Sequence, residues 1–134
     1  MPHVLAKPDD YLDKAYKNDA GETHCVEFVR QTLSLPHTSM WIEGTKVTEG
    51  ATIARGTAIA TFVNGKYPQT GSTGKHAAIY LEQNKVGIVV LDQWKAQGSV
   101  KKRTIKFTPT KPGLSNDGKA FSIIEIGEAK PPQK

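Results

Sequence analysis

This sequence has little cysteine and no long apolar run. Its 134 residues contain one cysteine, Cys25, which excludes an intrachain disulfide and a zinc site built from several thiolates. No window approaches the roughly eighteen apolar residues that span a bilayer, and the N-terminus has no apolar stretch of the secretory type. We therefore expect no membrane insertion and a chain made in the cytoplasm. To act elsewhere, it needs an apparatus that does not read such a signal, or lysis of its cell.

Acidic residues are the minority among the charged ones. Eighteen Lys and Arg against thirteen Asp and Glu give a formal charge of +5, which favours a polyanionic partner by long-range attraction. The one dense basic cluster, residues 101–103, has no aromatic residues interleaved for base stacking. We interpret it as a solvated strand entrance and expect no nucleic-acid partner.

Apolar periodicity predicts an α+β chain, with helices first and an antiparallel sheet after them. The spacing predicts a helix over 9–18 and a second helix over 25–35. The first helix is expected to cover the second. Strands are predicted over 57–63, 76–81, 87–94, 103–107 and 121–126, and the second and third of them form a hairpin. We expect a loop over 39–52, a tight turn at Asn64-Gly65 and a mobile loop over 67–75. One domain covers 1–128, and 129–134 form a disordered tail.

Cys25 is the first candidate for chemistry, because it lies where a polar, glycine-led turn gives way to an apolar helical stripe. A thiol in the first turn of a helix feels the partial positive charge of unpaired N–H groups, which favours the nucleophilic thiolate. The backbone N–H of Cys25 is also a natural donor to an oxyanion. The alternative is a small buried hydrophobe, since free cysteine is often buried.

His76 opens a predicted strand, and Asp92 lies near the end of the neighbouring one. A histidine there can take the thiol proton and later protonate a leaving amine, while a third polar group fixes its tautomer. Asp92 shares strand parity with Ile88 and Val90, whereas Gln93 points to the opposite face. We favour Asp92 because a carboxylate also stabilises the imidazolium, but a register shift of one residue gives the role to Gln93.

Three aromatic residues are candidates for lining a substrate groove. Trp41 and Trp94 can stack on a sugar or line a peptide groove, and Tyr80 shares a strand face with the candidate base. Core packing is the alternative for each of them. His24 is an alternative base, but adjacent residues on a helix point about 100° apart. Thiolate chemistry explains the polar residues without an added ion, so neither a metal nor a cofactor is expected.

The order of these motifs resembles the NlpC-type and CHAP-type branch of the papain-like cysteine peptidases. The matching segments are the nucleophile helix at 21–29, a Gly-then-apolar strand at 55–62, the histidine strand at 74–81 and the third-residue strand at 90–94. The resemblance implies a papain-like fold with N-terminal helices packed on the sheet, and a catalytic domain that cuts amide bonds in peptidoglycan. The small size and the ending at 116–122 look, more narrowly, like the amidase effectors of bacterial type VI secretion.

In those effectors an injected enzyme digests a rival's wall, and a cognate immunity protein protects the producer. The resemblance therefore implies peptidoglycan stem peptides as substrate, and an immunity protein and a component of the secretion apparatus as partners. It also implies the periplasm of a target cell as the place of action. The bond cut is either the D-alanine–diaminopimelate cross-link, which we favour, or the γ-D-glutamyl–diaminopimelate link within a stem.

Two functions of other classes stay open at this point. The basic charge and the tryptophans also fit a non-catalytic module that binds the cell wall or another polyanion, with a structural thiol. A basic nuclease-type toxin that uses His24 or His76 ranks third, because the sequence has no paired acid and phosphate-binding cluster for it. Thiol reactivity separates enzyme from module, since an activated thiolate is alkylated fast at or below neutral pH.

Overall fold

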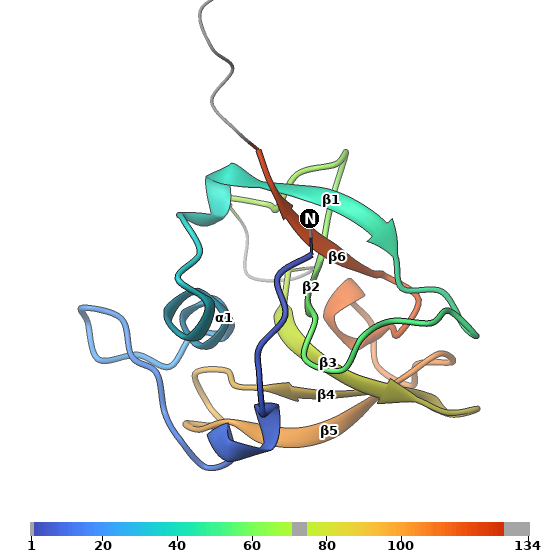
Figure 1. Cartoon of the computed structure of the whole chain (residues 1–134), viewed down its shortest axis with the longest axis horizontal. Coiled ribbons are helices and arrows are strands. Elements are labelled where there is room, and N and C mark those ends of the chain that lie inside the picture. The colour runs from blue at the N-terminus through green and yellow to red at the C-terminus, as the bar shows by residue number, and fades with distance from the viewer. Residues whose placement is uncertain (1, 71–74, 128–134) are drawn as a thin grey trace, which may run out of the picture.

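The structure, a computed structural model, describes residues 2–70 and 75–127. An antiparallel sheet of six strands forms its centre, in the order β1-β6-β2-β3-β4-β5, and helix α1 lies against one face (Figure 1). The strands are β1 (Trp41–Lys46), β2 (Ala58–Thr61), β3 (Ala77–Gln83), β4 (Gly87–Asp92), β5 (Lys101–Lys106) and β6 (Phe121–Ile126). The helices are α1 (Cys25–Leu33) and the 3-10 turns η1 (Pro8–Tyr11), η2 (Thr38–Met40) and η3 (Leu114–Asn116). The predicted α+β class is confirmed.

Helix α1 begins after His24, which is extended, and ends at Ser34, which is left-handed with φ +55°. Its apolar stripe buries Phe28 and Val29 completely, and these pack with Ile79 of β3 in the core on this side of the sheet. Burial of each such side chain contributes about 1.5–3 kcal/mol. A second core lies on the opposite face of the sheet, so both faces are covered.

The predicted helix over 9–18 is wrong. The chain forms only η1 there, because Asp13 is left-handed with φ +68° and the backbone groups bond elsewhere. The N–H of Asp13 donates to the carbonyl of Val100 at 2.9 Å, and the N–H of Val100 donates to the carbonyl of Lys14 at 2.7 Å. The segment still covers α1 as predicted, since the ring of Tyr16 lies 5.5 Å from that of Phe28.

The predicted loop over 39–52 contains a strand, β1, and is wrong to that extent. Strand β1 pairs antiparallel with β6 from Trp41 opposite Ile126, and its register is irregular after Glu43. Gly44 permits the close approach, because a Cβ there would lie 2.8 Å from the carbonyl oxygen of Ile123. The segment has no alternating pattern of its own, and pairing with β6 makes it a strand.

The five predicted strands are confirmed with small shifts at their ends, and β3 and β4 form the predicted hairpin. The predicted turn is confirmed as well. Asn64 and Gly65 both have positive φ, 52° and 78°, as a type I′ turn requires, and Val63 pairs with Lys66 across it.

The predicted mobile loop over 67–75 is partly fixed. Tyr67 is 5% exposed, and its ring packs edge-on against Trp41 with the centroids 5.1 Å apart. The Gln69 amide donates to the carbonyl of Tyr67 at 2.9 Å. Residues 71–74 of this prediction and the predicted tail at 129–134 lie outside the described residues. Within the described part of the chain, no helix has the length and apolar character needed to cross a membrane.

Candidate active site

The candidate nucleophile, Cys25, is the first residue of α1, as its position in the sequence predicts. The end of β4 and the residues after it hold this helix start. The side-chain amide of Gln93 donates to the carbonyl of His24 at 2.9 Å, and the hydroxyl of Thr23 donates to the carbonyl of Trp94 at 3.1 Å. The Cys25 side chain, which is partly exposed, therefore lies at the positive end of the helix dipole.

His76 directly precedes β3 and is 5% exposed. Its backbone N–H donates to Oγ1 of Thr61 in β2 at 3.0 Å, which fixes its place at the strand entrance. Its Nε2 donates to Oδ2 of Asp92 at 2.6 Å. Nδ1 is therefore the ring nitrogen available to the Cys25 thiol, whose pKa His76 lowers. One buried imidazole joins the thiol to the carboxylate.

Asp92, the last residue of β4, and Gln93, the residue after it, point in opposite directions. Asp92 reaches the imidazole of His76. Gln93 bonds the backbone N–H and carbonyl of Tyr16 at 3.1 and 2.7 Å, and the carbonyl of His24. Both side chains are completely buried. Strand alternation thus places Asp92 against the imidazole and commits Gln93 to the backbone of two other segments.

The pKa values of Cys25 and His76 shift in opposite directions. Burial raises the pKa of the Cys25 thiol, but the interaction with His76 outweighs burial, so the net shift of that pKa is downward. The Ala77 backbone and the Tyr67 hydroxyl, which lies 3.9 Å from Sγ, lower the pKa further. Burial lowers the pKa of His76, but hydrogen bonds with Asp92 and Cys25 outweigh it and raise that pKa to about 9. Both shifts favour a thiolate–imidazolium pair.

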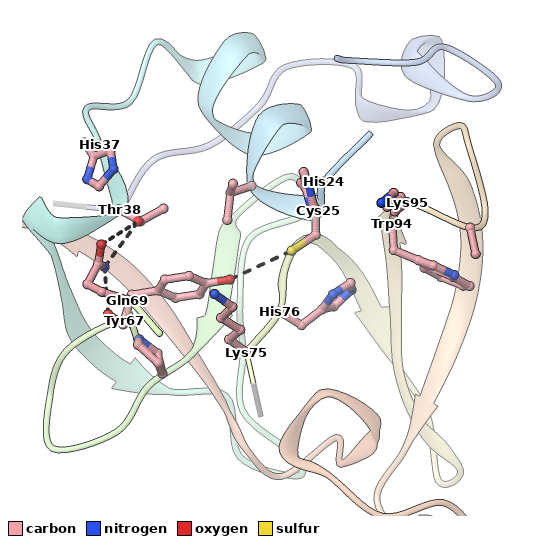
Figure 2. A pocket seen from close by; sticks show the side chains of 13 residues that line it. His24, Cys25, His37, Thr38, Tyr67, Gln69, Lys75, His76, Trp94 and Lys95 are labelled. Atoms are coloured by element: carbon pink, nitrogen blue, oxygen red, sulfur yellow. Dashed lines mark hydrogen bonds between the residues drawn. The ribbon is translucent and has the colours of Figure 1, made fainter. Parts of the chain in front are cut away.

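A cavity of about 670 Å³ opens at the thiol, large enough for a peptide segment. Cys25, His76 and Trp94 line it, and Figure 2 shows Lys75 projecting into it beside His76. Among the described residues, the lining holds two lysines, Lys75 and Lys95, and no carboxylate. The cavity is therefore suited to an anionic ligand.

Of the three aromatic residues predicted to line the groove, Trp94 reaches the cavity and is 37% exposed. The prediction is wrong for Trp41, which is fully buried, because its pairing in β1 carries the indole into the core; its N–H donates to the carbonyl of Pro36 at 3.2 Å. It is also wrong for Tyr80. That residue lies further along β3, away from the end where the cavity opens, in the core on the opposite face of the sheet.

His24, the alternative base, lies at the rim of the cavity and is bound to Glu22. Its Nε2 lies 3.1 Å from Oε1 of Glu22, whose other oxygen accepts from Lys95 at 2.8 Å. These hydrogen bonds, that of Lys95 first, lower the pKa of Glu22 to about 2. Within the described residues, no group of three or more His, Cys, Asp or Glu side chains is arranged to hold a metal ion.

Arg103 of β5 is a site residue that the sequence interpretation missed. Its Nε donates to Oδ2 of Asp92 at 2.7 Å, and its guanidinium lies over the ring of Trp94 with Cζ 4.9 Å from the centroid. The expectation of a solvated strand entrance is wrong for this residue. The available signal was the alternation of residues 103–107, which places Arg103 on the same face as the buried Ile105 and Phe107.

A thiol at a helix start that shares a buried imidazole with a carboxylate, on helix α1 packed against an antiparallel sheet, defines a papain-like cysteine hydrolase. Comparison with known proteins narrows this class. Residues 5–124 match the family described as domesticated amidase effector 2, and the chain belongs to this family.

Two relatives support the assignment. A type VI secretion amidase effector 2 protein of Salmonella typhi is 36% identical over 137 residues, which cover 93% of this chain and all of the relative. A solved structure of type 6 secretion amidase effector 2 matches with a TM-score of 0.81 at 34% identity, over 93% of this chain and 95% of that one. The predicted papain-like fold and the predicted amidase effector are confirmed, and the binding-module and nuclease alternatives are not supported.

Proposed function

We propose that this chain hydrolyses an amide bond in the stem peptides of peptidoglycan, with Cys25 as nucleophile, His76 as acid and base, and Asp92 as the group that orients His76. One observation carries the proposal. The imidazole of His76 is 5% exposed, bonds Asp92 at 2.6 Å, and lines the cavity together with the Cys25 thiol, whose pKa it lowers.

The reaction follows from this arrangement. The Cys25 thiolate attacks the carbonyl carbon, and N–H groups at the start of α1, which have no partner within the helix, stabilise the oxyanion. The His76 imidazolium then gives its proton to the amine nitrogen as the C–N bond breaks, which leaves a thioester. The neutral imidazole next takes a proton from water, which attacks the thioester. The tetrahedral intermediate formed by this attack then collapses as the C–S bond breaks, which releases the carboxylic acid and frees the Cys25 thiol group.

The charge of the cavity supports a stem peptide as substrate. Lys75 has no ion-pair partner among the described residues, whereas Lys95 is bound to Glu22. Stem peptides carry free carboxylates beside both candidate bonds, and Lys75, which lines the same cavity as Cys25, can bind one of them. We place the cut at the D-alanine–diaminopimelate cross-link, with the γ-D-glutamyl–diaminopimelate link as the alternative.

The proposed place of action is the periplasm of a target bacterium, reached through a type VI secretion apparatus. The producer then needs an immunity protein that blocks the cavity. An acidic inhibitor suits a chain with a formal charge of +5 and a cavity lined by lysines. The partner is expected to cover Trp94 and to bind more weakly as the salt concentration rises.

Digestion of purified Gram-negative sacculi, followed by mass spectrometry of the released muropeptides, tests the reaction and the bond together. We expect cross-linked dimers to disappear with the parent chain and to persist with Cys25→Ala and His76→Ala, whose folds are checked by circular dichroism. A parent rate of muropeptide release by folded Cys25→Ala would refute the mechanism. Loss of intact stems in place of cross-links would move the cut to the γ-D-glutamyl bond.

A further inference from the structure

The register of β5 against β4 places Arg103 beside the proposed catalytic pair. Arg103 lies opposite Val90, and directly opposed residues of antiparallel strands share a face. Its side chain therefore lies on the face of Asp92, two residues along β4. Lys102 lies opposite Leu91 and points to the other face. The register thus separates two neighbouring cations, only one of which is directed to the site.

The guanidinium of Arg103 contacts three groups of the site. Its Nε donates at 2.7 Å to Oδ2 of Asp92, the oxygen that also accepts from Nε2 of His76 at 2.6 Å. Its Nη2 lies 3.3 Å from that Nε2. The guanidinium also lies over the ring of Trp94, which lines the cavity. Arg103 therefore contacts both members of the imidazole–carboxylate pair and one residue of the cavity lining.

The charge of Arg103 balances the other charges of the site. A thiolate at Cys25, an imidazolium at His76, a carboxylate at Asp92 and the guanidinium of Arg103 sum to zero. Asp92 is completely buried, and its Oδ1 is bonded to none of the described residues, so its remaining hydrogen bonds decide its position. Without the guanidinium, a buried cluster would carry a net negative charge and hold the imidazolium proton more tightly.

We propose that Arg103 is a positioning residue of the amide hydrolysis, which holds the Asp92 carboxylate against His76 and balances its charge so that the imidazolium can release its proton to the leaving amine. The inference rests on the proposed function. Arg103 itself neither gives nor takes a proton. Among the described residues, the charged groups around His76 are Cys25 from α1, Asp92 from β4 and Arg103 from β5, and Lys75, which directly precedes His76, lines the same cavity.

The test compares Arg103→Met, which keeps the aliphatic stem, with Arg103→Lys, which keeps the charge. Lys102→Met, on the same strand but the other face, is the control. We expect Arg103→Met to lower kcat on a cross-linked muropeptide about tenfold to a hundredfold, the effect of one charge-assisted hydrogen bond. KM should stay within about threefold, because Arg103 makes no substrate contact in this proposal. Lys102→Met should leave kcat and KM unchanged.

Alkylation of Cys25 by iodoacetamide across pH 5–10 supplies a readout that needs no substrate, and labelling is unambiguous because the chain has one cysteine. The rate profile has one inflection for deprotonation of the Cys25 thiol and one for deprotonation of the His76 imidazolium. In Arg103→Met both inflections should move to higher pH by about half a unit or more, because a nearby positive charge is lost. In Arg103→Lys they should stay near the parent values while kcat falls.

A parent-like kcat and parent-like inflections in Arg103→Met, with only a lower melting temperature, would mean a structural role and overturn the inference. If Arg103→Met does not fold, an undiminished kcat in Arg103→Lys overturns it equally. A parent chain that leaves peptidoglycan intact, while Arg103→Met still shifts the alkylation profile, would refute the proposed substrate and support the role of Arg103.

Discussion

Asp92→Asn removes the negative charge of Asp92, which helps to raise the pKa of His76. Asparagine has the same shape as aspartate, so the change removes a charge from a completely buried position without opening a cavity. Its amide oxygen can still accept from Nε2 of His76, which keeps the ring in place. What is lost is the charge that stabilises the imidazolium.

The size of the effect follows from the pKa of His76. A rise from 6.5 to about 9 corresponds to about 3 kcal/mol in favour of the imidazolium. Burial acts against the charged form, so without the carboxylate the pKa should fall by at least about one unit. At pH 8.5 a group with a pKa of 9 is roughly three-quarters protonated, and a group with a pKa of 8 roughly one-quarter. The alkaline limb of the activity should therefore move to lower pH.

Histidine NMR titration measures this pKa directly, with the His76 signal assigned by its absence in His76→Gln. The matched control is Glu22→Gln, which neutralises a carboxylate at the rim of the cavity and should leave the His76 midpoint in place. The alkaline limb of kcat/KM on a cross-linked muropeptide provides the second readout. If the midpoint in Asp92→Asn stays within a few tenths of a unit of the parent value, the assignment of the carboxylate is refuted.

Three further predictions concern the surroundings of the site. Gln93→Ala removes three hydrogen bonds of a completely buried side chain and should lower the free energy of unfolding, measured by urea denaturation, by about 2–4 kcal/mol. Its effect on the midpoint of the His76 titration should be smaller than that of Asp92→Asn, and the reverse order would assign the orienting role to Gln93. Gly56→Ala should cost about 2 kcal/mol or more in the same assay, because Gly56 has φ +99° and a Cβ there would lie 2.3 Å from the carbonyl oxygen of Leu5; parent-like stability would contradict this. Lys75→Gln should raise KM about threefold to tenfold with kcat within about twofold, and an unchanged KM would remove Lys75 from substrate binding.

Local pattern predicted the elements that carry their own periodicity. Helix α1 has an apolar stripe and β6 is a β-rich run, and both were predicted closely. Strand β1 was missed because Gly44 and the residues around it become a strand only by pairing with β6. The predicted helix over 9–18 failed for a related reason, since Val100 and Gln93 bond backbone groups that a helix would use internally.

The contacts of the site were predictable as far as they depend on strand parity. Parity separated Asp92 from Gln93, and the structure places Asp92 against His76. Arg103 was missed because its approach to Asp92 depends on the register between β4 and β5, which no short segment encodes. Trp41 and Tyr80 were expected near the cavity from residue type and strand parity. The prediction failed because neither property tells how deeply a side chain is buried.

Asp92 and Gln93 are adjacent in the chain, yet one fixes the imidazole and the other fixes the backbone that precedes Cys25. The support of the imidazole and the support of the backbone before the thiol therefore meet at one peptide unit at the end of β4, while Thr61 of β2 holds the backbone of His76. The loop between β5 and β6 can change in length without moving the two reacting groups. A one-residue insertion just before Asp92 would instead exchange the two directions and disconnect both halves of the site at once. The fold thus allows the loop between β5 and β6 to diverge while the reaction centre stays fixed.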